Sequence, residues 1–213
     1  MPAAAALFDL DGVLIDSWQV ARRALGEALA EVGYAGEPPY AAFRRRMGKP
    51  LATILRELAL PAAAARPFNR TAMAMTDQVE MFAGVGEALA ALRGAGFRIG
   101  VVTGKDRRRA RAIVAATGLD GMIDALVTPD DAPGKPDPAG CSLCCALLGT
   151  PRPLAYVGDS AVDLDTARAA RIPAVLAAWG ALPRTRDLGW DAIVERPGAI
   201  TPELVRALGS AAR

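Results

Sequence analysis

Apolar positions in the second half of the chain alternate between short continuous runs and helical spacing. The runs predict strands, and the helical spacing predicts the segments between them. The expected strands cover 97–102, 125–128, 154–157, 174–177 and 192–194, and the expected helices cover 85–93, 107–117, 139–148, 161–170 and 202–208. This alternation predicts an α/β fold, with a parallel sheet covered by helices on both faces.

The segment that follows the first apolar run has a different pattern. Residues 18–32 have helical spacing, with Ser17 expected to cap the helix and Gly33 to end it. Further helices are expected near 40–47, 51–60 and 62–80, and no strand pattern precedes residue 97. We therefore expect a core of residues 1–15 and 82–213, and an inserted α-helical domain at 16–81 with hinges near Asp16 and 82–84.

Composition limits the possible partners. The 213 residues are 52% hydrophobic and 23% charged, with a net charge of +2, which is ordinary for a globular protein. The basic clusters at 44–46 and 107–109 are short and typical of solvated helix faces, so we expect neither a nucleic-acid nor a membrane partner. No signal-peptide pattern or long apolar span is present, and we expect a cytoplasmic protein, a monomer or a small homo-oligomer.

The chain contains no histidine, which is the usual general base of serine and cysteine hydrolases. Carboxylates must therefore do any acid–base work. Cys141, Cys144 and Cys145 have no further cysteine or histidine with which to complete a zinc site, so they are expected to pack in the core. The only lysines, Lys49, Lys105 and Lys135, attract interest because the chain otherwise uses arginine for its basic residues.

Two acids follow the first apolar run, AAAALF, in the sequence DLDG. If the run is a strand, its period of two directs Asp9 and Asp11 to the same side of the strand tip. One carboxylate can then act as a nucleophile while the other gives and takes a proton. The alternative is a simple Asp-Gly turn that closes the strand.

Polar residues also follow two later strands. Thr103 and Gly104 offer a hydroxyl and free backbone N–H groups to a phosphate, although Thr103 is equally suited to capping the next helix. Lys135 lies between prolines that restrict its loop, where it either contacts solvent or fixes a positive charge against a phosphoryl group.

The strand 154–157 leads directly into Asp159 and Asp163. Their spacing places both carboxylates on one side of a helical turn, which suits Mg²⁺, a cation that prefers oxygen ligands. The alternative is a helix cap with acids favoured by the helix dipole.

These four segments together resemble the motifs of the haloacid dehalogenase-like hydrolase superfamily, in its phosphatase branch. The resemblance rests on DLDGVLIDS, VVTG, GKP and GDSAVD in this order, and it spans almost the whole chain. It implies a Rossmann-like core with a helical cap similar to that of phosphoglycolate phosphatase and β-phosphoglucomutase relatives. It also implies a small-molecule phosphate ester as substrate.

The resemblance further implies a mechanism and a set of roles. Asp9 forms an aspartyl-phosphate, and Asp11 acts as general acid and then as general base. Mg²⁺ is held by the Asp9 side chain, the Asp11 backbone carbonyl and Asp159, with Asp163 in support. Thr103, Gly104 and Lys135 hold the phosphoryl oxygens.

The cap turn Arg-Met-Gly-Lys resembles the place where relatives bind the non-reacting end of the substrate. Arg45, Arg46 and Lys49 are therefore substrate-binding candidates, with a solvated basic stretch as the alternative. The resemblance also implies ester hydrolysis rather than dehalogenation, because the dehalogenases of this superfamily lack an acid at the position of Asp11. A sugar-phosphate mutase is the nearest alternative, although the cap histidine of related mutases is missing. A non-catalytic phosphate-binding module and a structural subunit are the alternatives from other functional classes.

Overall fold

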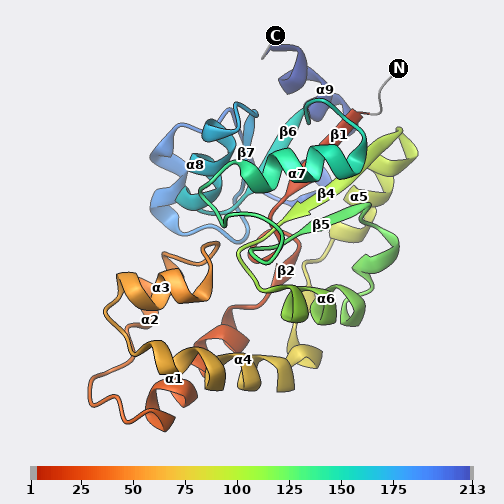
Figure 1. Cartoon of the computed structure of the whole chain (residues 1–213). Helices are drawn as coiled ribbons and strands as arrows, with labels where there is room; N and C mark the ends of the chain where they lie inside the picture. Colours follow the sequence, from red (N-terminus) through yellow and green to blue (C-terminus); the bar gives the residue numbers. More distant parts are fainter. Residues whose placement is uncertain (1–3, 212–213) are drawn as a thin grey trace.

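The computed structural model describes residues 4–211, in which six parallel strands form one sheet (Figure 1). The order across the sheet is β5 (Ala125–Val127), β4 (Phe97–Val102), β1 (Ala4–Phe8), β6 (Ala155–Gly158), β7 (Ala174–Ala177) and β8 (Ala192–Val194). Strand β1 lies near the middle, paired with β4 on one side and β6 on the other. The residues that follow these three strands therefore meet at one edge of the sheet.

The sheet is buried on both faces because alternate residues of each strand enter different cores. Ala5 and Leu7 of β1 pack on the face covered by two helices, while Ala6 and Phe8 pack on the opposite face. The first face carries α7 (Ala139–Leu148) and α8 (Ala161–Ala169), and the second carries α5 (Val85–Gly94), α6 (Arg107–Ala116) and α9 (Pro202–Ala211). The predicted α/β fold is confirmed.

A group of helices is inserted between β1 and β4, beyond the carboxyl edge of the sheet (Figure 1). The helices are α1 (Trp18–Glu31), α2 (Tyr40–Arg44), α3 (Leu51–Glu57) and α4 (Ala65–Ala74), with short 3-10 turns at 62–64 and 76–78. Helix α1 packs along α4, and the rings of Phe43 and Phe68 lie 5.7 Å apart between α2 and α4. The insertion thus has apolar contacts of its own.

Two expectations for this region were wrong. A short antiparallel ribbon joins β2 (Ile15–Asp16) to β3 (Glu80–Met81), so strands do precede residue 97. The helix expected to reach residue 80 ends at Ala74. A two-residue strand is too short to display alternation in the sequence. The ribbon holds together the two connections between the helices and the sheet, where the domain boundary is predicted.

Ser17 does not cap α1 as expected. The helix has no side-chain hydrogen bond at its N-cap; instead, the Ser17 hydroxyl donates to the Asp11 carboxylate. The backbone N–H of Trp18 donates to Asp16 Oδ1 at 3.2 Å. A cap residue and a tertiary hydrogen-bond donor have the same sequence signature, because a serine hydroxyl serves both roles.

The three cysteines are free thiols on α7 and are buried, as predicted. Among residues 4–211, no helix combines the length and the apolar character needed to cross a bilayer.

Candidate active site

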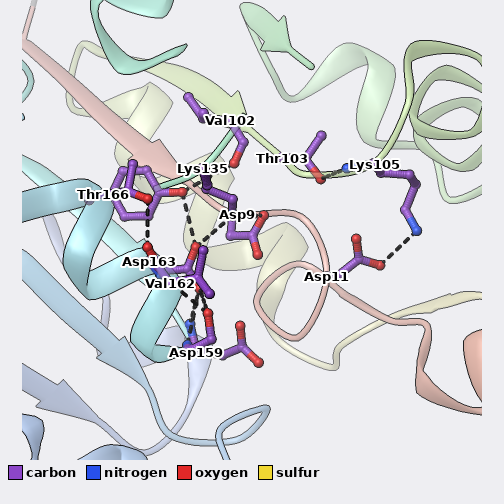
Figure 2. A network of polar contacts seen from close by, with 12 residues as sticks. Asp9, Asp11, Val102, Thr103, Lys105, Lys135, Asp159, Val162, Asp163 and Thr166 are labelled. Carbon is purple, nitrogen blue, oxygen red and sulfur yellow. Dashed lines mark hydrogen bonds and ion pairs between the residues drawn. The ribbon is translucent and has the colours of Figure 1, made fainter. Parts of the chain in front are cut away.

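The carboxyl ends of three neighbouring strands supply the candidate catalytic groups. Asp9 follows β1, Thr103 follows β4 and Asp159 follows β6. Because these strands are parallel neighbours, their ends lie together, and Figure 2 shows Asp9, Lys135, Asp159 and Asp163 gathered there.

Asp9 is almost fully buried, yet its carboxylate has only one ion-pair partner in the described structure. Lys135 Nζ lies 2.8 Å from Asp9 Oδ1, whereas Asp9 Oδ2 is buried and has no hydrogen-bond partner among residues 4–211. Burial raises the pKa of Asp9 to about 8; the Lys135 charge opposes this shift, and the negative charges of Asp163 and Asp11 add to it. An unpartnered buried carboxylate oxygen is costly in a folded protein, so this atom is suited to bonding a ligand.

Lys135 joins two carboxylates. Its Nζ also lies 2.6 Å from Asp163 Oδ1, and the lysine side chain is 1% exposed. Burial by itself would lower the pKa of Lys135, but the charges of Asp163 and Asp9 outweigh it, and the pKa is raised. Lys135 is therefore a fixed positive charge within the site.

Asp163 is held in place from several directions. Its Oδ2 accepts hydrogen bonds from the backbone and hydroxyl of Ser160 and from the backbone of Asp159, forming a capping box at the start of α8. Its Oδ1 accepts from Lys135 and, at 3.3 Å, from the Tyr156 hydroxyl. The capping alternative is thus correct for Asp163. The same carboxylate also orients Lys135.

Carboxylate oxygens of Asp9, Asp159 and Asp163 lie within 4.8 Å of one another. Burial raises the pKa of Asp159 well above its usual value, and the nearby charges of Asp163 and Asp9 raise it further. Lys135 pairs with Asp9 and Asp163 but not with Asp159, so the cluster holds more carboxyl groups than its one buried lysine can neutralise if all are ionised. Together with the free oxygen of Asp9, this donor set fits a hard divalent cation such as Mg²⁺.

Asp11 has different partners from Asp9. Strand β1 ends at Phe8, so both acids follow the strand rather than lie within it, and Gly12 adopts a φ of +77°. That the two carboxylates flank one reacting centre stays a prediction. The Asp11 carboxylate points to Lys105 Nζ at 3.0 Å (Figure 2), and Ser17 Oγ donates to the same oxygen. Burial would raise the pKa of Asp11, but Lys105 and Ser17 outweigh it, and the pKa is lowered.

Thr103 and Gly104 follow β4, and Gly104 lies against a turn of the helical insertion. Thr103 is buried and its Oγ1 accepts from the Lys105 backbone at 3.2 Å, while Asp106 is the residue that caps α6. A Cβ placed on Gly104 would lie 2.1 Å from the carbonyl oxygen of Gly48. Only a glycine permits this approach, so the insertion and the second motif are in direct backbone contact.

The three basic candidates of the insertion differ in their surroundings. Arg45 lines a cavity beside Asp11 and Asp159. Arg46 Nε lies 3.2 Å and Lys49 Nζ lies 2.7 Å from the carboxylate of Glu57. Their role in substrate binding stays a prediction, and the geometry favours Arg45 because the other two side chains are engaged with Glu57.

Sequence reasoning assigned no site role to Ser17, Lys105 or Tyr156. Lys105 did stand out as one of three lysines, but nothing in its local sequence indicated Asp11 as its partner. Tyr156 lies within an apolar strand, where its hydroxyl could not be distinguished from core packing. These contacts depend on which strand ends are neighbours.

Comparison with known proteins agrees with this geometry. A family model described as haloacid dehalogenase-like hydrolase matches residues 6–177. The chain belongs to this family. The plasmid phosphoglycolate phosphatase of Cupriavidus necator is 35% identical over 95% of each chain. The N-acetylmuramic acid 6-phosphate phosphatase of Pseudomonas aeruginosa is 30% identical over 96% of each chain.

Solved structures show the same haloacid dehalogenase-like fold. A putative phosphoglycolate phosphatase from Lactobacillus plantarum superposes with a TM-score of 0.82 at 24% identity, covering 94% of this chain and 98% of its own. A putative haloacid dehalogenase-like hydrolase from Bacteroides fragilis gives 0.83 at 25% identity, covering 93% and 99%. The expected family and enzyme class, a phosphoric monoester hydrolase, are confirmed.

Proposed function

We propose that this haloacid dehalogenase-like hydrolase removes the phosphoryl group from a small-molecule phosphate monoester through an aspartyl-phosphate on Asp9, with Mg²⁺ as cofactor. The observation that carries the proposal is the buried Asp9 Oδ2, which has no hydrogen-bond partner among residues 4–211 and belongs to a carboxylate whose Oδ1 lies 2.8 Å from Lys135 Nζ. A nucleophile needs such a free oxygen directed into a site that already carries compensating charge.

In the first step, the Asp9 carboxylate attacks phosphorus and the bond from phosphorus to the ester oxygen breaks. Asp11 donates its proton to the leaving oxygen, so an alcohol departs. In the second step, Asp11 accepts a proton from a water molecule whose oxygen attacks phosphorus. The Asp9–phosphorus bond then breaks, which releases inorganic phosphate and restores both carboxyl groups.

Charge neutralisation supports both steps. Lys135 places its ammonium against the phosphoryl oxygens, and Thr103 and Gly104 offer a hydroxyl and backbone N–H groups from the end of β4. Asp9, Asp159 and the backbone carbonyl of Asp11 would hold Mg²⁺, with Asp163 in support. When bound, the cation neutralises the charge that phosphoryl transfer spreads over the equatorial oxygens.

We further propose that residues 16–81 act as a cap over a core of residues 1–15 and 82–213. Two contacts support this division. The Gly48 carbonyl closes on Gly104, and the Arg109 guanidinium of the core lies 5.2 Å from the ring centroid of Phe68 in α4. A cap in this position excludes water from the reacting centre.

The two relatives described above are named for different substrates, phosphoglycolate and a sugar phosphate. Family membership therefore supports phosphate-ester hydrolysis but does not identify the alcohol that is released. 2-Phosphoglycolate and a hexose 6-phosphate are the natural first members of a substrate panel.

The proposal is tested by phosphate release from that panel, with and without Mg²⁺, for the wild type and for Asp9→Asn. We expect release that requires Mg²⁺ and falls at least about 10³-fold in Asp9→Asn. Rapid quenching should trap phosphate on the wild-type chain and none on the variant. Release that survives Asp9→Asn would refute the nucleophile. Isomerisation of a sugar phosphate without release would identify a mutase instead.

A further inference from the structure

A cavity of about 270 Å³ opens between the helical insertion and the sheet core. Asp11, Gly12, Asp159 and Ser160 are among the residues that line it. Asp9, Thr103 and Lys135, which are proposed to hold the phosphoryl group, do not line it. A leaving group that accepts a proton from Asp11 would therefore extend into this cavity.

Part of the cavity wall comes from the core, in the loop that follows β7. Trp179 and Leu182 line it. The indole Nε1 of Trp179 donates to the Val13 carbonyl at 3.0 Å, so its polar edge is satisfied and its ring is held in place. Gly180, beside it, packs so closely on Gly12 that a Cβ would lie 1.8 Å from the Gly12 carbonyl oxygen. The wall is thus a fixed apolar surface joined to the first motif.

The insertion supplies a second aromatic ring. Trp18, the first residue of α1, lines the same cavity, and the Arg44 guanidinium lies 5.1 Å from its ring centroid. Cavities of this composition bind ligands with apolar bodies and a few orienting polar groups.

Two cations in the cavity lack a partner within the described chain. Arg45 of the insertion and Arg184 of the core both line it, and no side-chain hydrogen bond or ion pair is found for either among residues 4–211. Of the lining acids, Asp11 is already paired with Lys105, and Asp159 belongs to the carboxylate cluster. Asp16 is the remaining acid. With Asp11 paired and Asp159 assigned to the carboxylate cluster, the two arginines outnumber the remaining acid, and this part of the cavity carries excess positive charge.

We propose that the core-side loop, through Arg184 and Trp179, selects a phosphate monoester whose leaving group combines an apolar, planar body with a second anionic group. This inference rests on the proposed phosphatase function and adds the substrate class. Arg184 is a specificity-determining residue that binds the distal anion, and Trp179 contacts the body of the leaving group. Specificity is therefore shared between the core and the insertion.

The volume supports a leaving group larger than a two-carbon acid. At roughly 30 Å³ for each water-sized group, 270 Å³ accommodates about nine such groups. A carboxylated ring is of this size. Glycolate would leave much of the cavity and both tryptophan faces in contact with water.

The test compares 4-carboxyphenyl phosphate with phenyl phosphate, which lacks only the distal carboxylate. We expect Arg184→Ala to raise KM for 4-carboxyphenyl phosphate about tenfold and to leave KM for phenyl phosphate unchanged. Arg184→Lys should restore part of the affinity. The matched control is Arg186→Ala, because Arg186 lies in the same loop but pairs with Glu195 and does not line the cavity.

Binding is measured separately from turnover by fluorescence titration of Asp9→Asn. Trp18 and Trp179 line the cavity, so a ligand seated there should quench their emission. We expect a lower Kd for 4-carboxyphenyl phosphate than for 2-phosphoglycolate, and loss of this preference in Asp9→Asn combined with Arg184→Ala.

Two outcomes would overturn the inference: equal effects of Arg184→Ala on both aryl esters, or tighter binding of 2-phosphoglycolate. Neither outcome affects the phosphatase proposal, which is tested by phosphate release and would fail if no ester were hydrolysed. In that case the titration still decides which class of ester the cavity binds.

Discussion

The Lys105 ammonium lies 3.0 Å from Asp11 Oδ1, and both residues are only 9% exposed. The Ser17 hydroxyl donates to the same oxygen. A buried carboxylate without partners favours its protonated form, so these two partners keep Asp11 ionised. To act as a general acid, Asp11 must exchange them for the substrate and take up a proton.

The ion pair predicts a pH-dependent coupling energy. In a cycle of Lys105→Met and Asp11→Asn on metal-free protein, we expect a coupling of about 1–3 kcal/mol in urea unfolding at pH 7. Because the folded pKa of Asp11 is lowered below 3.8, its contribution is complete above that value and is lost as the pH falls through the folded pKa. A cycle at the exposed Arg23–Glu27 pair is the control, with a much smaller coupling. A coupling energy of zero at pH 7 would show that the Lys105–Asp11 ion pair does not stabilise the folded protein.

The raised pKa of Asp9 predicts that the stability of the metal-free protein depends on pH in the opposite direction. In the folded state this pKa is raised from 3.8 to about 8, so the folded state binds a proton more tightly than the unfolded state in this window. Stability should therefore decrease as the pH rises from about 4 to 8. Asp9→Asn should flatten this dependence in thermal unfolding measured in the presence of a chelator.

The raised pKa of Asp9 also predicts that stabilisation of the protein by Mg²⁺ depends on pH. Protons compete with the cation for Asp9, so the gain in Tm on adding Mg²⁺ should be larger at pH 8 than at pH 5.5, by roughly 4 °C or more. Asp9→Asn should reduce the gain at pH 8. A gain independent of both pH and Asp9 would place the cation elsewhere.

Gly104→Ala tests the contact between the insertion and the core. The new methyl group would lie 2.1 Å from the Gly48 carbonyl oxygen, so the turn that carries Gly48 must move away. We expect kcat/KM to fall at least about tenfold, since small misplacements of positioning groups have large effects. Gly94→Ala is the control, because a Cβ there meets no atom within 4 Å. Equal activity of the two variants would show that the contact is dispensable.

The cap arginines should differ in their effect on KM. Arg45 lines the cavity, whereas Arg46 bonds to Glu57 and to the Ala42 carbonyl at 3.0 Å. With the preferred ester, Arg45→Ala should raise KM severalfold and Arg46→Ala should change it little. Steady-state kinetics with both variants decides this. A larger effect of Arg46→Ala would mean that the turn rearranges when substrate binds.

The sequence by itself determined the features that depend on local patterns. The apolar runs located the six strands of the sheet, and helical spacing located the insertion, because both follow from the periods of strands and helices. The acids and the lysine were found because they directly follow such strands or lie in a restricted loop. The two-residue ribbon at 15–16 and 80–81 was missed because it is shorter than any pattern.

Only the tertiary structure decided which side chains meet. Lys105 reaches Asp11 because β1 and β4 are neighbours, and Ser17 turns from its helix toward the same carboxylate. The tertiary structure also separates Arg45 from Arg46, which are adjacent in sequence but face different partners, and brings Arg184 and Trp179 to the same cavity. The geometry of these contacts depends on the packing of whole elements rather than on local periodicity.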